Sequence, residues 1–351
     1  MFPAIAIADA LREIHPGTEF LFVGALGRLE MEKVPEAGYR ITGLPVRGFQ
    51  RRMSWKNITF FFLLLRSMVM ARRIIREFDP HAALGVGGYA SGPILKAAVR
   101  RGIPILIQEQ NSYAGVTNRI LARSAKTICV AYDRMDRYFP ADRIVLTGNP
   151  VRRQLMQPGS HRQKDLETFR LEQGKQTCLV LGGSLGARTI NTSIMEGLDR
   201  LNREDLQLIW QCGSGFHTEA ERAVAAREME GARVYAFITR MDAAYGAADI
   251  IVSRAGAITI SELCLVGKPV ILVPSPNVAE DHQTRNAEAL TGQDAALLVP
   301  DRLAGKELVD TLLGLLHDEE RKETLSSNIK KLGISDAAQR IATEVIKIIR
   351  Q

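Results

Sequence analysis

The sequence has few cysteines, and none of them are paired. The four cysteines lie far apart, each in or beside an apolar segment: Cys129, Cys178, Cys212 and Cys264. This spacing excludes a disulfide framework and a zinc-ligand set, because both need cysteines at close, regular intervals. We therefore expect reduced cysteines in the core of a cytosolic protein.

The sequence also has no apolar run that reaches the length of a membrane span. The apolar stretch Ile58–Leu65 ends at Arg66, whereas a spanning helix needs about 20 apolar residues. Residues 1–14 carry Asp9, Arg12 and Glu13, so this segment is predicted to be an ordinary helix and not a signal peptide. Hydrophobic residues make up 46% of the chain and charged residues 24%, which is typical of a globular protein.

Several catalytic signatures are missing. There is no Gly-Lys-Ser/Thr phosphate loop and no Asp-x-Asp pair, so we expect no metal ion and no other cofactor. Residues Gly182–Gly186 do spell the G-x-S-x-G of serine hydrolases, but no His and Asp loops follow in the order that this motif requires. The sequence therefore disfavours phosphate-loop enzymes and serine hydrolases.

Positive charge is concentrated in one window. The net charge is +7, yet residues 38–76 alone hold nine basic residues and no acidic one. A helix predicted over 58–77 places apolar residues on one face: Ile58, Phe61, Phe62, Leu65 and Val69. Two interpretations stay open, a core-packing helix or an element that binds an anionic membrane surface. Both hold if the helix packs inward and the preceding residues face outward: Arg47, Phe49, Arg51, Arg52 and Trp55.

With 351 residues, two domains are the natural expectation. Short apolar strands alternate with helices in both halves, which predicts an α/β fold of two Rossmann-like domains with parallel sheets facing a cleft. The apolar period lapses over Gln157–Lys175, so we place the domains at 1–155 and 156–335, with a last helix at 336–351 that packs back on the first domain. A doubly wound sheet usually begins with a strand; here a helix comes first, so we expect that strand to lie upstream of Met1.

Glycine-rich turns between strand and helix occur in both halves. Gly85–Ala90 matches G-x-G-x-x-A, and Glu109 ends the next predicted strand, so a nicotinamide-dependent oxidoreductase stays an alternative. The turn at Gly182–Ala187 is of the same type, but its next strand ends at Gln211 without a carboxylate for a ribose. A turn of this kind in each half favours one ligand bound from both sides.

The most informative stretch is residues 248–286. A buried strand is followed by the turn Ser253–Gly256 and a short helix, Ala257–Val266. Free N–H groups at a helix start bind anions, and Thr259 and Glu262 share one helix face. Polar residues that include Gln283 and Asn286 then follow a second strand, where open α/β sheets bind ligands. The combination predicts a nucleotide-sugar site.

At this point the chain resembles the GT-B-fold glycosyltransferases of family 28, which includes the enzymes that make lipid II. The resemblance covers nearly the whole chain and is carried by the following segments: Phe2-Pro3-Ala4, Gly85–Pro93, Glu109-Gln110-Asn111, Gly148–Arg152, Gly182–Ala187, Phe237-Ile238, Ala257–Glu262, and His282-Gln283 with Asn286. Two features depart from the family pattern. A GGTGGH loop, whose His is the favoured base, would lie upstream of Met1, and Gln108 stands where the family has His.

The resemblance implies a role for individual residues. Ile238 would hold the uracil edge through its backbone, with Arg152 nearby, and Glu262 would hold the ribose. The diphosphate would lie at Ser184, Thr259 and the helix start, and the GlcNAc hydroxyls at Gln283, Asn286 and, from the first half, Asn111. Glu109 is the fallback base. The full set implied to bind substrate is Asn111, Arg152, Ser184, Ile238, Ala257, Ile258, Thr259, Ile260, Ser261, Glu262, Gln283 and Asn286.

The implied reaction transfers GlcNAc with inversion from UDP-GlcNAc to the MurNAc 4-hydroxyl of lipid I. It would take place at the cytoplasmic face of the inner membrane, with the basic window on the anionic leaflet and no nucleic acid as partner. A related glycosyltransferase that acts on diacylglycerol is the main alternative, since it shares the fold and the donor half. A nicotinamide-dependent oxidoreductase or a binding module without activity is a weaker one.

Overall fold

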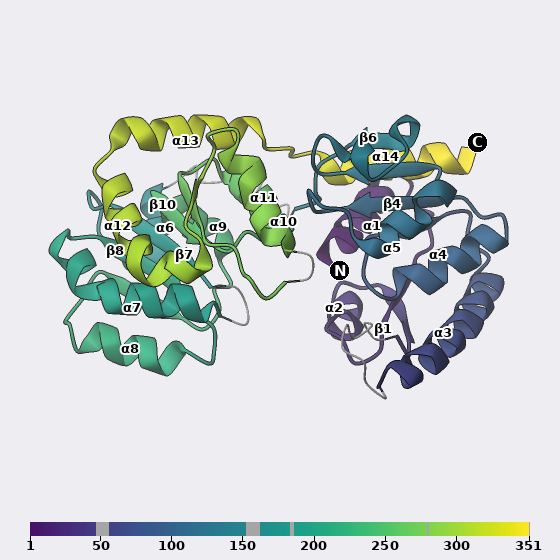
Figure 1. Ribbon diagram of the computed structural model, residues 1–351, viewed down its shortest axis with the longest axis horizontal. Helices are drawn as coiled ribbons and strands as arrows, with labels where there is room; N and C mark the ends of the chain where they lie inside the picture. Colours follow the sequence, from purple (N-terminus) through teal and green to yellow (C-terminus); the bar gives the residue numbers. More distant parts are fainter. Residues whose placement is uncertain (47–55, 152–161, 183–185, 279–280, 351) are drawn as a thin grey trace. The chain divides into compact units, whose positions relative to one another are not determined.

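The structure is a computed structural model that describes residues 1–46, 56–151, 162–182, 186–278 and 281–350 (Figure 1). The predicted site residues Arg152 and Ser184 lie outside the described residues, as do Arg47, Phe49, Arg51, Arg52 and Trp55. The chain forms two compact units. Unit 1 comprises residues 1–151 and 336–351, and unit 2 comprises residues 152–335. A cleft between the two halves stays a prediction.

Unit 1 alternates short parallel strands with helices. Strands β1 and β2 form one sheet and β3 to β6 form another, in the order β3-β4-β5-β6. A strand ahead of α1 stays a prediction. The elements are α1 (Phe2–Ile14), β1 (Leu21–Ala25), α2 (Glu30–Glu36), β2 (Arg40–Leu44), α3 (Lys56–Phe78), β3 (Ala83–Gly85), α4 (Ser91–Arg100), β4 (Ile105–Glu109), α5 (Val116–Leu121), β5 (Thr127–Val130), β6 (Ile144–Leu146) and α14 (Ala337–Arg350).

Both faces of the larger sheet in unit 1 are covered, as expected for a parallel sheet whose strands are mostly apolar. Ile105 and Ile107 of β4 point into a cluster with residues of α3, α4 and α5. Leu106, between them, points to the other face and packs with α1 and α14, because side chains alternate along a strand. The last helix of the chain thus belongs to the core of the first unit (Figure 1).

The apolar stripe on α3 faces away from this core. Phe62, Leu65 and Val69 are 71%, 66% and 57% exposed, whereas Ala71 and Ile75 are buried. The interpretation of the stripe as a core-packing face is therefore wrong for these three residues. The helical period identifies an apolar stripe, but it does not tell which stripe is buried. Ala71 and Ile75, further along the helix, are the residues that pack in the core of unit 1.

Unit 2 contains one parallel sheet of six strands in the order β12-β11-β10-β7-β8-β9. The helix α6 interrupts the stretch 157–175 that the sequence analysis treats as linker. The elements are α6 (Arg162–Thr168), β7 (Thr177–Leu181), α7 (Arg188–Arg203), β8 (Gln207–Gln211), α8 (His217–Ala225), β9 (Ala232–Tyr235), α9 (Met241–Ala247), β10 (Ile250–Ser253), α10 (Ala257–Val266), β11 (Val270–Leu272), α11 (His282–Thr291), β12 (Leu297–Leu298), α12 (Ala304–Leu316) and α13 (Glu319–Lys331).

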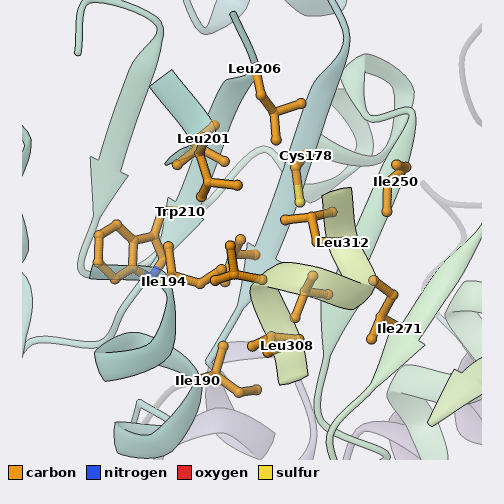
Figure 2. Packing of buried hydrophobic residues seen from close by; sticks show 14 of the residues in the cluster. Cys178, Ile190, Ile194, Leu201, Leu206, Trp210, Ile250, Ile271, Leu308 and Leu312 are labelled. Atoms are coloured by element: carbon orange, nitrogen blue, oxygen red, sulfur yellow. The ribbon is translucent and has the colours of Figure 1, made fainter. Parts of the chain in front are cut away.

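The core of unit 2 lies between this sheet and the helices α7 and α12. Figure 2 shows Trp210 and Cys178 from the strands beside Ile194 of α7 and Leu312 of α12, all of them 0% exposed. Trp210 also donates a hydrogen bond from Nε1 to Oδ1 of Asn191 at 3.1 Å. The large ring is therefore buried without an unsatisfied N–H, and it fixes α7 against the sheet.

The expectation of reduced core cysteines is confirmed, since all four cysteines are free and buried. Burial raises the pKa of Cys129 and of Cys264 to about 12, and it raises the pKa of Cys212 to about 11. These thiols are therefore protonated at neutral pH and unsuited to act as nucleophiles. Across the described residues, no helix has the length and apolar character that crossing a membrane requires.

Candidate functional site

The candidate site of unit 2 lies at the carboxyl ends of β7 and β10. From β7 the strand order runs to β8 and β9 on one side and to β10, β11 and β12 on the other. Such a reversal of strand order is where open α/β sheets bind ligands, since the loops on its two sides diverge. The turns that lead into α7 and α10 both leave the sheet here.

Two helices start at this point without a side chain capping them. Neither Ala187 before α7 nor Gly256 before α10 makes a side-chain cap hydrogen bond. Gly186 precedes α7 at a φ of +72°, and a Cβ there would lie 2.6 Å from the Cys212 carbonyl oxygen, so only glycine fits this turn. Both helix starts lie at the carboxyl edge of the sheet, and N–H groups at helix starts bind anions, so this edge suits a diphosphate.

The first turn of α10 carries most of the predicted diphosphate contacts. Ala257, Ile258 and Thr259 are half-buried at the start of the helix. Ile260 is 2% exposed and packs inward, and the Ser261 hydroxyl donates to the Ala257 carbonyl at 3.1 Å. Both side chains therefore have contacts within the protein, and their predicted part in substrate binding stays a prediction.

Glu262 holds a mostly buried carboxylate in the second turn of α10. The residue is 9% exposed, and its Oε2 accepts a hydrogen bond from the Tyr245 hydroxyl at 3.2 Å. A carboxylate in this position is an acceptor-only group, which suits the hydroxyls of a ribose. The position agrees with the prediction for Glu262, while Tyr245 was not among the predicted residues.

Gln283 and Asn286 lie on helix α11, although the sequence analysis assigned no helix to these residues. The Oε1 atom of Gln283 accepts from the Ser275 N–H at 2.9 Å, and Gln283 is half-buried. Asn286 is 0% exposed and donates from Nδ2 to the Ala255 carbonyl at 3.4 Å. Asn286 thus supports the turn before α10, and its contact with a sugar stays a prediction.

Ile238 follows β9 and is only 2% exposed, while its neighbour Phe237 is 56% exposed. The backbone N–H of Ile238 donates to Oε1 of Gln211 at 2.9 Å, and the Gly182 N–H donates to the Gln211 carbonyl at 2.9 Å. Gln211, which the sequence analysis cited only for the absence of a carboxylate, thus connects the loop predicted to bind uracil with the glycine turn before α7.

An ion pair between Arg254 and Asp301 holds the two helix starts together. Arg254 lies in the turn before α10, and its Nη1 donates to Asp301 Oδ1 at 2.5 Å and to the Val273 carbonyl at 2.9 Å. The other carboxylate oxygen of Asp301 accepts from the hydroxyl of Thr189 in α7 at 3.1 Å. Arg254 lies in the turn that sequence analysis singled out, but nothing in the sequence indicates that Asp301 is its partner.

In unit 1, Glu109 does not suit the role of base. It is 2% exposed, and its two oxygens accept from four N–H groups, those of Asn111 N (3.1 Å), Asn111 Nδ2 (3.3 Å), Gly115 N (3.0 Å) and Asn118 Nδ2 (2.8 Å). A base must reach the proton that it removes, and this carboxylate is enclosed by its own loop. Glu109 instead orients the loop that carries Asn111.

We expect Glu109→Gln to lower turnover without changing the form of its pH profile. The added NH₂ group would face N–H donors, so the loop that carries Asn111 would rearrange at a cost of about 1–3 kcal/mol. The pH dependence of kcat measures the difference, because loss of a base removes a titrating limb. A lost limb with an unchanged melting temperature would restore Glu109 as the base.

Comparisons with known proteins agree with this architecture. The model of the glycosyltransferase family 28 N-terminal domain matches residues 1–130, and that of the C-terminal domain matches residues 177–341. Among solved structures, MurG of Acinetobacter baumannii aligns with a TM-score of 0.80 and 28% identity over 99% of this chain and 95% of its own. A UDP-GlcNAc 2-epimerase from Neisseria meningitidis aligns with a TM-score of 0.68 at 15% identity, over 99% and 96%, which shows the fold alone.

Curated relatives are more similar to this chain in sequence than these solved structures are. A protein of Phocaeicola vulgatus is 55% identical over 99% of this chain and 93% of its own length, and one of Parabacteroides distasonis is 54% identical over 99% and 95%. Both are named UDP-N-acetylglucosamine–N-acetylmuramyl-(pentapeptide) pyrophosphoryl-undecaprenol N-acetylglucosamine transferase. The two parallel-sheet units and the uncapped helix starts at a reversal of strand order agree with these matches. Because the identity exceeds one half along nearly the full length and both family models match, the chain belongs to glycosyltransferase family 28.

Proposed function

We propose that this protein transfers GlcNAc from UDP-GlcNAc to the MurNAc 4-hydroxyl of lipid I, with inversion, to form lipid II. One observation carries the proposal: two uncapped helix starts on the adjacent strands β7 and β10, with the Glu262 carboxylate one turn away. The names of the relatives supply the identity of the sugar and the acceptor.

In this proposal the diphosphate lies between the starts of α7 and α10, and the uridine extends over β8 toward Ile238. The strand order supports this path, since β7 and β8 separate β10 from β9 in the sheet. Glu262 accepts from the ribose hydroxyls, and Gln283 lies on the opposite side of the phosphates, toward the sugar. Arg152 and Ser184 keep their proposed roles beside the uracil and the diphosphate.

The chemical step is an in-line displacement. The acceptor oxygen forms a bond to C1 of GlcNAc as the bond from C1 to the diphosphate oxygen breaks, and the hydroxyl proton passes to a base. The N–H groups of Ala257 and Ile258 stabilise the negative charge that develops on departing UDP. Glu109 does not suit the base, and we assign none among the described residues.

The deciding experiment supplies the native protein with UDP-GlcNAc and either a short-chain lipid I analogue or diacylglycerol. We expect GlcNAc transfer and release of UDP with the lipid I analogue alone, also with EDTA present. Turnover of diacylglycerol would favour the related glycolipid enzyme. Absence of turnover with both acceptors, together with absence of UDP binding, would overturn the proposal.

We also propose that unit 1 binds the anionic cytoplasmic leaflet of the inner membrane through α3, as a peripheral protein. The exposed stripe Phe62, Leu65 and Val69 supports this, because contiguous apolar side chains on a protein surface usually mark a site that binds a membrane or another protein. The same helix carries four arginines: Arg66, Arg72, Arg73 and Arg76. Apolar side chains beside cations suit an anionic leaflet.

We expect the double variant Phe62→Ser/Leu65→Ser to bind anionic vesicles at least about tenfold more weakly. Burying one such apolar side chain contributes about 1.5–3 kcal/mol, and each substitution removes part of this contribution to the binding free energy. Vesicle flotation with and without phosphatidylglycerol measures this binding. Ile349→Ser is the matched control, because Ile349 is an exposed apolar residue (45%) on α14. An undiminished affinity of the double variant would show that α3 does not bind the membrane.

A further inference from the structure

Tyr245 donates a hydrogen bond to the Glu262 carboxylate. It lies on α9 and is 1% exposed, among the largest fully buried side chains described. Its hydroxyl donates to Oε2 of Glu262 at 3.2 Å, and Glu262 is itself 9% exposed. A contact between two buried groups from different helices is specific to the tertiary fold, because seventeen residues separate them in the chain.

The chemistry of this donor matters for what the carboxylate does. A buried carboxylate needs hydrogen-bond partners to remain charged. Asp301 has a cation as partner, since Arg254 donates to it at 2.5 Å, and its charge is largely compensated. The phenol of Tyr245 donates to Glu262 without itself adding positive charge, and a carboxylate oxygen has more than one lone pair with which to accept from a ligand hydroxyl.

Tyr245 lies on a helix that connects the loop proposed to bind uracil with Glu262. Helix α9 begins at Met241, three residues after Ile238, and residues 243–247 are all buried. The same short helix thus follows the loop proposed to bind the base and carries the hydroxyl that contacts Glu262. Any displacement of α9 would change both contacts together.

We propose that Tyr245 is a positioning residue for ribose recognition, acting through Glu262. This inference rests on the proposed function, because it assigns the ribose of a nucleoside diphosphate to Glu262. Without the phenol oxygen, the carboxylate loses this hydrogen bond from α9, and hydrogen bonds to the 2′- and 3′-hydroxyls would lengthen. The diphosphate contacts, which use backbone N–H groups, would stay unchanged.

The test compares Tyr245→Phe with the wild type in calorimetric binding of UDP, 2′-deoxy-UDP and inorganic diphosphate. We expect UDP to bind about tenfold more weakly, as loss of one hydrogen bond to a charged group predicts, and the preference for UDP over 2′-deoxy-UDP to fall toward one. Affinity for inorganic diphosphate should not change. In turnover, KM for UDP-GlcNAc should rise while kcat is retained.

Two further variants make the result specific. Tyr39→Phe is the matched control, because the Tyr39 hydroxyl donates to Asp9 at 2.6 Å in unit 1, and it should leave UDP binding unchanged. In the Glu262→Ala background, which removes the acceptor, Tyr245→Phe should have little additional effect, since a double-mutant cycle isolates the coupling of the pair. Equal effects of Tyr245→Phe in both backgrounds would overturn the inference, and so would an unchanged preference for UDP over 2′-deoxy-UDP. The proposed function would still stand in either case if the wild type binds UDP. If the wild type binds no UDP, both fail.

Discussion

Replacing Glu262 with glutamine should lower kcat/KM for UDP-GlcNAc by about 10- to 100-fold, mostly through KM. Each hydrogen bond to a charged acceptor contributes about 1.5–3 kcal/mol, and a neutral amide retains only part of it. The change is isosteric, and the amide oxygen can still accept from the Tyr245 hydroxyl, which in the wild type lies 3.2 Å from Oε2. Steady-state kinetics at varied UDP-GlcNAc measures the effect.

A control is needed because Glu262 is buried. Glu344→Gln offers one: the Glu344 side chain is 14% exposed, lies on α14 in unit 1 and pairs with Lys347 at 2.6 Å. It should change stability slightly and KM not at all. If Glu262→Gln had the KM of the wild type, the ribose would bind elsewhere and the proposed donor site would be wrong.

The second large effect is expected from Arg254→Met. This change removes the donor to Asp301 and to the carbonyls of Val273 and Pro274. Breaking a buried ion pair costs about 3–5 kcal/mol because one charge is left unpaired; here both side chains are 17% exposed, so we expect about 2–4 kcal/mol. Urea unfolding of the protein measures this free energy.

Loss of Arg254 should also weaken the binding of UDP-GlcNAc, by more than the loss of folding free energy explains. The pair connects the turn before α10 with Thr189 near the start of α7, so without it the two sets of N–H groups can separate. Arg321→Met is the matched control, because Arg321 pairs with Asp294 at 2.7 Å on the surface, and exposed pairs contribute about 0–1 kcal/mol. Equal losses of stability in the two variants would contradict the buried role of Arg254.

Asp301→Asn separates the contribution of the ion pair's charge from that of the geometry of the turn. The amide still accepts from Thr189 or Arg254 but carries no charge, so the geometry of the turn is largely retained. We therefore expect a smaller loss of stability than for Arg254→Met, with UDP affinity close to that of the wild type. Thermal unfolding with and without UDP compares the two variants.

Local pattern was sufficient for much of unit 2. The helix Ala257–Val266 has the bounds that the sequence analysis assigns to it, because Gly256 precedes it and Gly267 ends it at a φ of +66°. Strands such as β7 and β10 are short apolar runs bounded by glycine and polar residues, and the expected parallel pairing is present. Helix α11 was missed because its first turn is polar and its apolar residues come late.

Long-range partners could not be predicted in this way. The carboxylate of Asp301 lies 47 positions from Arg254 and that of Glu262 seventeen positions from the Tyr245 hydroxyl, and no local pattern pairs them. The same limit applies to Glu109, whose position at a strand end suggested a base. Its four hydrogen bonds become evident only once the loop 110–118 folds back over it.

The sequence by itself determined the fold class, the glycine turns and the helix that starts at Ala257, because these depend on periodicity and turn chemistry. Membership of family 28 follows from similarity to known sequences along nearly the whole chain. Only the tertiary structure decided which polar groups are buried against one another, that Asn286 supports a turn, and that the apolar stripe of α3 faces outward. The physical reason is that burial and hydrogen-bond pairing depend on the packing of distant segments, which periodicity along the chain does not encode.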